Sequence, residues 1–161
     1  MDFSIATSEQ MHALGKRIGQ ILVARDVICL DGPLGAGKTT FTQGLAEGLG
    51  VLGLVTSPTY VVSRVHKPAT SGLTLVHVDA YRLADARDLE DLDLAQHGDF
   101  VLVMEWGKSF ADELGDEWLL IEIDRGSDAL DESDPAGGER KVTMTGHGPR
   151  WSNLDQLLST S

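Results

Sequence analysis

Gly32-Pro33-Leu34-Gly35-Ala36-Gly37-Lys38-Thr39 is the stretch that decides the fold of this chain, and it follows the short apolar run at residues 27–30. Its spacing is GxxxxGK[ST], the pattern of a phosphate-binding P-loop between a strand and a helix. Such a loop turns sharply while its backbone N–H groups point inward at an anion, and glycines permit that close approach. The stretch therefore predicts a nucleotide-binding site between a strand and a helix.

The residues after this loop have the pattern of a helix. Phe41, Leu45 and Leu49 recur every four residues on one face, and Gly50 is placed to end the helix. The positive N-terminal end of such a helix attracts phosphate. We therefore expect nucleotide contacts from the residues at this junction: Gly35, Ala36, Gly37, Lys38, Thr39 and Thr40. In this pattern the lysine reaches the β and γ phosphates and the Thr39 hydroxyl binds Mg²⁺.

Length and charge limit what the protein can be. A chain of 161 residues with 42% apolar content forms one domain, residues 1–161, with a real core. With 13 basic and 25 acidic residues the formal net charge is −12. Such a surface repels nucleic-acid phosphate, so we do not expect direct binding to RNA or DNA.

The cysteine content and the apolar runs indicate the compartment. Cys29 is the single cysteine and lies in the apolar run before the loop, where a buried structural thiol is expected. Apolar runs such as residues 100–104 are too short to cross a bilayer. Residues 1–4 lack the basic region and apolar core of a signal peptide. We expect a soluble, cytoplasmic protein with no membrane partner.

The remaining chain alternates between helix and strand patterns. Thr7 and Gln10 have capping-box spacing ahead of an amphipathic helix that reaches Leu22. Strand patterns occur at residues 59–64, 73–78, 100–104, 118–123 and 140–144, with a turn at 67–72 that predicts a hairpin. Short helices are expected at 85–94 and 151–158, and a mobile acidic loop at 126–138. The pattern predicts a three-layer α/β domain with a mixed sheet.

Two carboxylates follow strand patterns that are expected to end near the phosphates. Asp79 follows residues 73–78 and Glu105 follows residues 100–104. Either carboxylate could hold Mg²⁺ or orient the attacking water. Trp106 either fills the core or lies over the site.

Two further features bear on the nucleotide. The polar segment at residues 56–60 suits either a loop that senses the γ phosphate or a plain turn. The chain has one asparagine, Asn153, near its end, so it lacks the Asn-Lys-x-Asp guanine-binding motif of common GTPases, and we expect ATP.

Four ordered motifs resemble a known family. They are the P-loop through Thr40, Ser57-Pro58-Thr59-Tyr60, His77-Val78-Asp79-Ala80-Tyr81-Arg82-Leu83, and Met104-Glu105-Trp106. Together they are similar to the bacterial TsaE (YjeE) family, the ATPase component of the tRNA threonylcarbamoyladenosine system, over most of residues 5–110. The chain departs from the family pattern at Ala80 and in the acidic loop at 126–138, neither of which belongs to the nucleotide motifs.

This resemblance implies a fold, an activity and partners. The fold would be P-loop NTPase-like, with a parallel sheet core extended by antiparallel strands. The activity would be ATP hydrolysis, low in the isolated protein, in partnership with TsaD and TsaB. TsaD transfers the threonylcarbamoyl group to an adenosine beside the tRNA anticodon, so an acidic TsaE-like protein would meet tRNA only through the complex.

The resemblance also implies roles for single residues. Lys38 and Thr39 would bind phosphate and Mg²⁺, and Glu105 would be the second Mg²⁺ ligand. Asp79 would lie near the γ phosphate, and Trp106 would support activity or partner contact. Ser8 would lie near the adenine.

Two other functions remain open from the residues alone. A small-molecule P-loop kinase is one, although such kinases close an arginine-bearing lid over the phosphates. Here Arg64, Arg82 and Arg87 are scattered and the late loop is acidic. The other is a nucleotide-regulated binding module, in which ATP mainly switches residues 56–60 and turnover is incidental.

Overall fold

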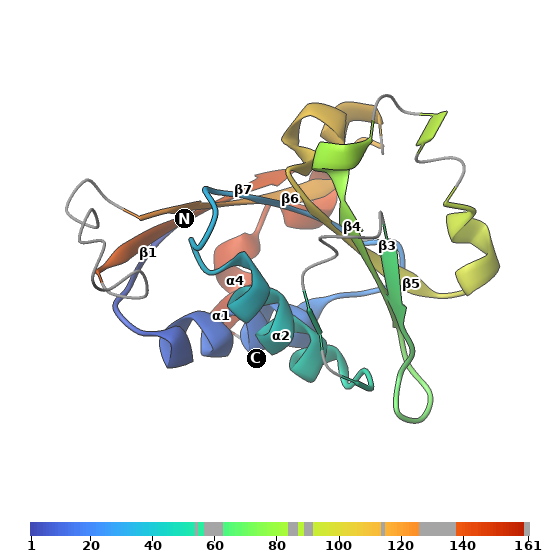
Figure 1. The fold of residues 1–161 in the computed structure, drawn as a ribbon, viewed down its shortest axis with the longest axis horizontal. Helices are drawn as coiled ribbons and strands as arrows, with labels where there is room; N and C mark the ends of the chain where they lie inside the picture. Colours follow the sequence, from blue (N-terminus) through green and yellow to red (C-terminus); the bar gives the residue numbers. More distant parts are fainter. Residues whose placement is uncertain are drawn as a thin grey trace.

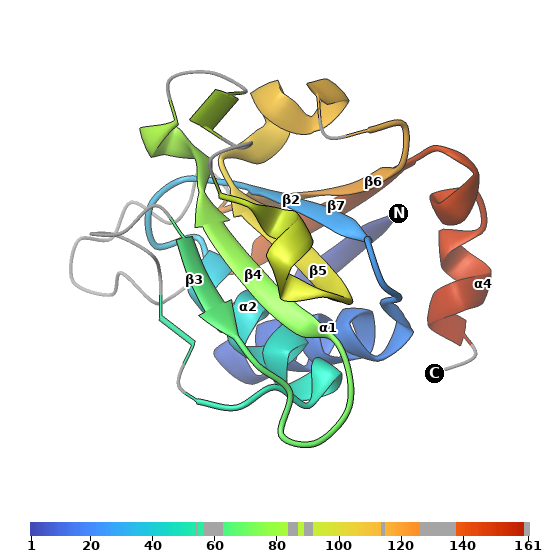
Figure 2. The same cartoon turned by 90° about the vertical axis from the view of Figure 1, so that its right-hand side faces the viewer.

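A seven-stranded mixed sheet organises the chain (Figures 1 and 2). The computed structural model describes residues 1–53, 55–56, 63–83, 87–88, 92–113, 115–125 and 138–159. The strand order is β1-β7-β6-β2-β5-β4-β3. The strands are β1 (Asp2–Ile5), β2 (Val27–Asp31), β3 (Ser63–His66), β4 (Thr74–Asp79), β5 (Phe100–Glu105), β6 (Trp118–Asp124) and β7 (Arg140–His147).

The centre of the sheet is parallel and its margins are antiparallel. Strand β2 pairs in parallel with β5 and β6, and β4 pairs in parallel with β5. Antiparallel pairs add β7 to β6, β1 to β7, and β3 to β4. The predicted α/β fold with a parallel core and antiparallel strands is therefore confirmed, including the hairpin around residues 67–72.

The helices form a layer on each side of the sheet. Figure 1 shows α1 (Ser8–Ile21), α2 (Lys38–Leu49) and α4 (Leu154–Ser159) together on one face. Short 3-10 helices complete the described structure: η1 (Ala80–Arg82), η2 (Leu94–His97), η3 (Gly107–Glu113) and η4 (Pro149–Trp151). Two apolar clusters result, one beneath α1 and α2 and the other on the opposite face, where Leu94 and Phe110 of the 3-10 helices pack. None of the helices in the described ranges is long and apolar enough to span a bilayer.

Glycines bring α1 and α2 into backbone contact. A Cβ atom added at Gly15 would lie 2.1 Å from the Phe41 carbonyl oxygen, and one at Gly44 would lie 2.0 Å from the His12 carbonyl oxygen. No side chain larger than hydrogen fits at such distances without a shift of backbone. This close packing sets the start of α1 beside the loop that precedes α2.

The predicted cap of α1 is present with one difference. The Thr7 hydroxyl accepts from the Gln10 N–H at 3.2 Å, as a capping box requires. The Gln10 side chain accepts from the Ala6 N–H at 2.7 Å, one residue before the expected partner. The reciprocal bond of the cap thus goes to the Ala6 N–H and not to the Thr7 N–H that the sequence pattern predicted.

Other predicted elements differ in bounds or lie outside the described residues. Helix α2 begins at Lys38, two residues before the predicted start, and the predicted closing helix is divided into η4 and α4. Most of the strand predicted at residues 59–64 and half of the helix predicted at 85–94 fall outside the described residues, as do the loop at 126–137 and Ser57-Pro58-Thr59-Tyr60.

Candidate functional site

The P-loop connects β2 to α2, and the N–H groups of the first turn of α2 point out of the helix at this junction. Gly37, at φ +113°, is the N-cap of α2 and offers no side chain to the first turn. The first N–H groups of an α-helix have no partner within the helix. Those of Lys38, Thr39 and Thr40 are therefore donors that suit an anion at this terminus.

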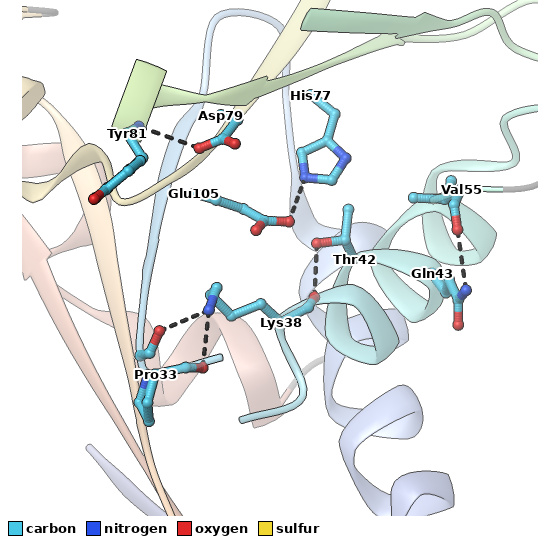
Figure 3. Close-up of polar contacts among 10 residues, drawn as sticks. Pro33, Lys38, Thr42, Gln43, Val55, His77, Asp79, Tyr81 and Glu105 are labelled. Carbon is cyan, nitrogen blue, oxygen red and sulfur yellow. Dashed lines mark hydrogen bonds and ion pairs between the residues drawn. The ribbon is translucent and has the colours of Figure 1, made fainter. Parts of the chain in front are cut away.

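Lys38 lies folded against this loop. Its Nζ donates to the carbonyl oxygens of Gly32 at 2.6 Å and Pro33 at 3.1 Å (Figure 3). The residue is only 6% exposed, and burial lowers the pKa of its ammonium group, although the charges of Glu105, Asp31 and Asp79 act in the opposite direction. Lys38 is thus a desolvated cation surrounded by acidic residues.

Asp79 and Glu105 end two neighbouring parallel strands and are direct partners in the β4–β5 register. Both are buried, at 9% and 4% exposure. Asp79 Oδ1 accepts from the Tyr81 N–H at 3.2 Å and starts η1, while Glu105 Oε1 lies 2.9 Å from His77 Nε2. The structure therefore brings the two predicted carboxylates together beside Lys38.

Trp106 lies over this cluster. Its backbone is left-handed, with φ +61°, and its N–H donates to the Leu30 carbonyl oxygen at 2.8 Å. Lys38 Nζ is 4.4 Å from the centroid of its ring, and the exposed Tyr81 ring is 6.1 Å away. Of the two positions that the sequence left open for Trp106, the structure shows the one over the site.

A pocket of about 260 Å³ lies on the other side of the loop. It is lined by Thr7, Ser8, Met11, Gly35, Gly37, Thr40 and Arg140. Ser8, which the resemblance placed near the adenine, is thus next to three of the predicted loop residues. The residues assigned to the nucleotide fall into two groups, one in this pocket and one around Lys38.

Arg140 and His77 are site residues to which the sequence reasoning gave no role. Arg140 Nε donates to the carbonyl oxygen of the buried loop residue Ala36 at 3.0 Å, from strand β7. His77 belongs to a motif that the sequence showed, but its contact with Glu105 joins residues 28 positions apart. The sequence did contain one signal for a role of His77. The buried-strand pattern places it two residues before Asp79, so both side chains lie on the same face of the strand.

A larger cavity of about 530 Å³ lies away from the loop, between α1 and the C-terminal segment. It is lined by Gln20, Ile21, Pro149, Arg150, Ser152, Asn153, Gln156 and Leu157. Arg150 donates two hydrogen bonds to the Asp26 carboxylate, at 3.0 and 3.1 Å. The cation that lines this cavity is thus already paired, and no carboxylate is among its described lining residues.

Known proteins resemble this chain in both sequence and fold. The profile of the family described as "Threonylcarbamoyl adenosine biosynthesis protein TsaE" matches residues 5–133. The chain belongs to the TsaE family. TsaE proteins take part in tRNA threonylcarbamoyladenosine biosynthesis, and the resemblance that the four motifs indicated is confirmed.

Individual TsaE proteins are similar over most of the chain. The TsaE protein of Streptomyces coelicolor is 50% identical over 147 residues, which are 90% of this chain and 96% of that protein. That of Bacillus subtilis is 37% identical over 151 residues, 94% of this chain and 89% of that protein. The crystal structure of Bacillus subtilis YdiB superposes with a TM-score of 0.76 at 32% identity, covering 99% of this chain and 94% of that one.

Proposed function

We propose that this TsaE-family protein binds Mg²⁺–ATP at its P-loop and hydrolyses it to support tRNA threonylcarbamoyladenosine modification. The observation that carries the proposal is the meeting of Lys38 with the paired carboxylates of Asp79 and Glu105 at one edge of the sheet. A cation at a phosphate cradle and carboxylates at adjacent strand ends are the parts that P-loop nucleotide hydrolysis requires.

The residues at this edge suit a nucleotide and Mg²⁺. The start of α2 offers N–H groups to an anion, because its cap Gly37 has no side chain that could accept from them. The Thr39 hydroxyl and the Glu105 carboxylate supply oxygen ligands, which Mg²⁺ prefers. No cluster of three or more His, Cys, Asp or Glu side chains suited to a metal occurs in the described ranges. A Mg²⁺ ion here would therefore complete its coordination with water and phosphate oxygens, as this ion usually does.

Each residue then has a defined task. Lys38 exchanges its hydrogen bonds with the Gly32 and Pro33 carbonyls for bonds to phosphate oxygens, and its desolvated charge acts strongly there. Thr39 and Glu105 hold Mg²⁺, and Asp79 or Glu105 orients the attacking water. A Mg²⁺ ion held there would supply positive charge that polarises the phosphoryl group.

The same proposal includes partners. TsaD- and TsaB-like proteins would assemble with this protein, and tRNA would be reached only through them. Exposed Tyr81 and the half-buried Trp106 lie at the mouth of the site, where a bound partner would sense the nucleotide state. Activity of the isolated protein would be low, because P-loop sites are commonly completed by a partner.

Release of inorganic phosphate from ATP, with and without TsaB and TsaD, tests the activity. Lys38→Ala is expected to remove nucleotide binding and turnover. Lys16→Ala, a surface lysine paired with Glu47, is the matched control and should behave as the natural protein does. Full activity of Lys38→Ala would contradict the proposal, and a phosphorylated small-molecule acceptor in place of free phosphate would favour a kinase.

Pull-down of TsaB and TsaD in ATP, in ADP and without nucleotide tests the partners. Retention of the partners that depends on the nucleotide is expected. Failure to bind in every nucleotide state would leave the ATPase without its place in the modification system.

A further inference from the structure

His77 is a fully buried polar residue next to the site. It lies in β4 between Leu75 and Asp79, two residues from each, so the three side chains share one face of the sheet. Its exposure is 0%, and Leu75 on the same face belongs to the apolar cluster beneath α1 and α2. A polar ring in such a place is costly unless it is hydrogen-bonded.

The ring makes its hydrogen bond to Glu105. Nε2 lies 2.9 Å from Glu105 Oε1, and Figure 3 shows the ring directed at that carboxylate above Lys38. The other ring nitrogen, Nδ1, is buried without a hydrogen-bond partner among the described residues. An ionised carboxylate can only accept, so with Glu105 ionised the donor of this hydrogen bond is Nε2.

The unpaired His77 nitrogen lowers the stability of the fold, but the ring orients the Glu105 carboxylate. A leucine of similar size would fill the same space without leaving a ring nitrogen unpaired. The imidazole instead holds one oxygen of a carboxylate that is itself 4% exposed, and it leaves Oε2 for another ligand. Ligating carboxylates are commonly held by such hydrogen bonds, which fix their direction toward a metal.

We propose that His77 is a positioning residue that fixes the Glu105 carboxylate in the direction needed to hold Mg²⁺ at the P-loop. The inference rests on the proposed function of Glu105, whereas the His77–Glu105 hydrogen bond is a feature of the structure itself. His77 touches neither nucleotide nor water in this scheme and acts only through Glu105.

Variants at two buried histidines test this role. His77→Leu removes the donor, and His77→Gln keeps an N–H group at a similar reach. His66→Leu is the matched control, because His66 is also buried, at 9%, on the neighbouring strand β3, and its Nε2 also has no partner among the described residues. ADP binding without Mg²⁺ checks that each variant retains a folded P-loop.

In His77→Leu the Mg²⁺ concentration for half-maximal ATP hydrolysis is expected to rise about 10- to 100-fold, as when a partner of a metal ligand is lost. Metal-free ADP affinity should stay within about twofold, since Lys38 and the helix start are unchanged. His77→Gln should recover most of the Mg²⁺ dependence, and His66→Leu should not alter it. An equal loss in His77→Leu and His66→Leu, or no recovery in His77→Gln, would overturn the positioning role.

Two measurements separate this inference from the proposed function. Mn²⁺ binding in the presence of ADP, followed by electron paramagnetic resonance, should weaken in His77→Leu without any need for turnover. Long-range ¹H–¹⁵N spectra of the natural protein should show His77 protonated at Nε2, with its signals shifted by Glu105→Gln. If His77 is protonated at Nδ1 instead, the inference is wrong even when ATP hydrolysis is found. If hydrolysis is absent while the Nε2 tautomer and Mn²⁺ effect are present, the proposed function fails and the positioning role stands.

Discussion

Lys38 Nζ lies 4.4 Å from the centroid of the Trp106 ring, so the cation of the P-loop and the residue after Glu105 are in direct contact. The other two tryptophans are farther into the fold, with Trp118 stacked on His147 at 3.7 Å and Trp151 only 2% exposed. The fluorescence of the protein should therefore report on Lys38 through Trp106.

Nucleotide binding is expected to change tryptophan emission, because Lys38 would turn from the ring to phosphate oxygens. In Trp106→Phe the change should be absent, while titration calorimetry should show nucleotide affinity altered by less than about tenfold, given that a cation–π contact is worth about 0.5–2 kcal/mol. Trp118→Phe is the control and should leave the signal in place. An emission change that persists in Trp106→Phe would mean that another tryptophan reports nucleotide binding, and would contradict the expected role of the Lys38–Trp106 contact.

Substitutions of the two strand-end carboxylates are expected to impair ATP hydrolysis in different ways. Glu105→Gln should raise the Mg²⁺ concentration needed for hydrolysis, because it weakens an oxygen ligand. Asp79→Asn, if Asp79 orients the water, should lower kcat at saturating Mg²⁺ by about 10²–10⁴-fold. Steady-state phosphate release over a range of Mg²⁺ concentrations distinguishes a raised Mg²⁺ requirement from a lowered kcat. If Asp79→Asn raises the Mg²⁺ requirement and Glu105→Gln lowers kcat, the two roles are the reverse of those stated here.

Gly44→Ala should destabilise the protein, although the same change stabilises an open helix by about 1 kcal/mol. The new Cβ would meet the His12 carbonyl oxygen at 2.0 Å, so α1 and α2 must move apart, at an overpacking cost of about 1–3 kcal/mol. Urea unfolding measures the loss of unfolding free energy. Gln20→Ala, at an exposed position of α1, is the control and should change stability by less than about 0.5 kcal/mol.

Cys29 should make the protein sensitive to alkaline pH. Burial raises the pKa of its thiol from 9.0 to about 12, so above pH 9 the unfolded chain loses this proton before the folded one does. Stability from this group is complete below pH 9 and falls by about 1.4 kcal/mol per pH unit toward pH 12. Thermal unfolding of the natural protein and Cys29→Ala across pH 8–11 should show the steeper decline only in the natural protein. Equal slopes would contradict the effect of burial.

Local patterns in the sequence predicted much of the fold and half of the site's geometry. The P-loop, the helix ended by Gly50 and the apolar strand ending at Glu105 are each specified by neighbouring residues, and each is present. Because parallel strands end at a common edge, the meeting of Asp79 with Glu105 also followed from their positions after strands.

Contacts between distant residues were not predictable in this way. Strand β1 has four residues and only Phe3 and Ile5 as apolar positions, so its pairing with β7 left little local signal. The Arg140–Ala36 hydrogen bond joins residues 104 positions apart. Such contacts depend on the order of strands in the sheet, which no local pattern of turns or apolar residues determines.

The hydrogen bond from Arg140 makes the P-loop depend on a strand near the end of the chain. It holds the Ala36 carbonyl from β7, which begins beyond the end of the family match at residue 133. Strand β7 is also the partner of both β1 and β6. A fragment trimmed to the matched region, residues 5–133, would expose the edge of β6, lose most of β1 together with its partner β7, and remove a wall of the pocket at Ser8. The minimal folding unit of this ATPase candidate is therefore larger than the stretch by which its family is recognised.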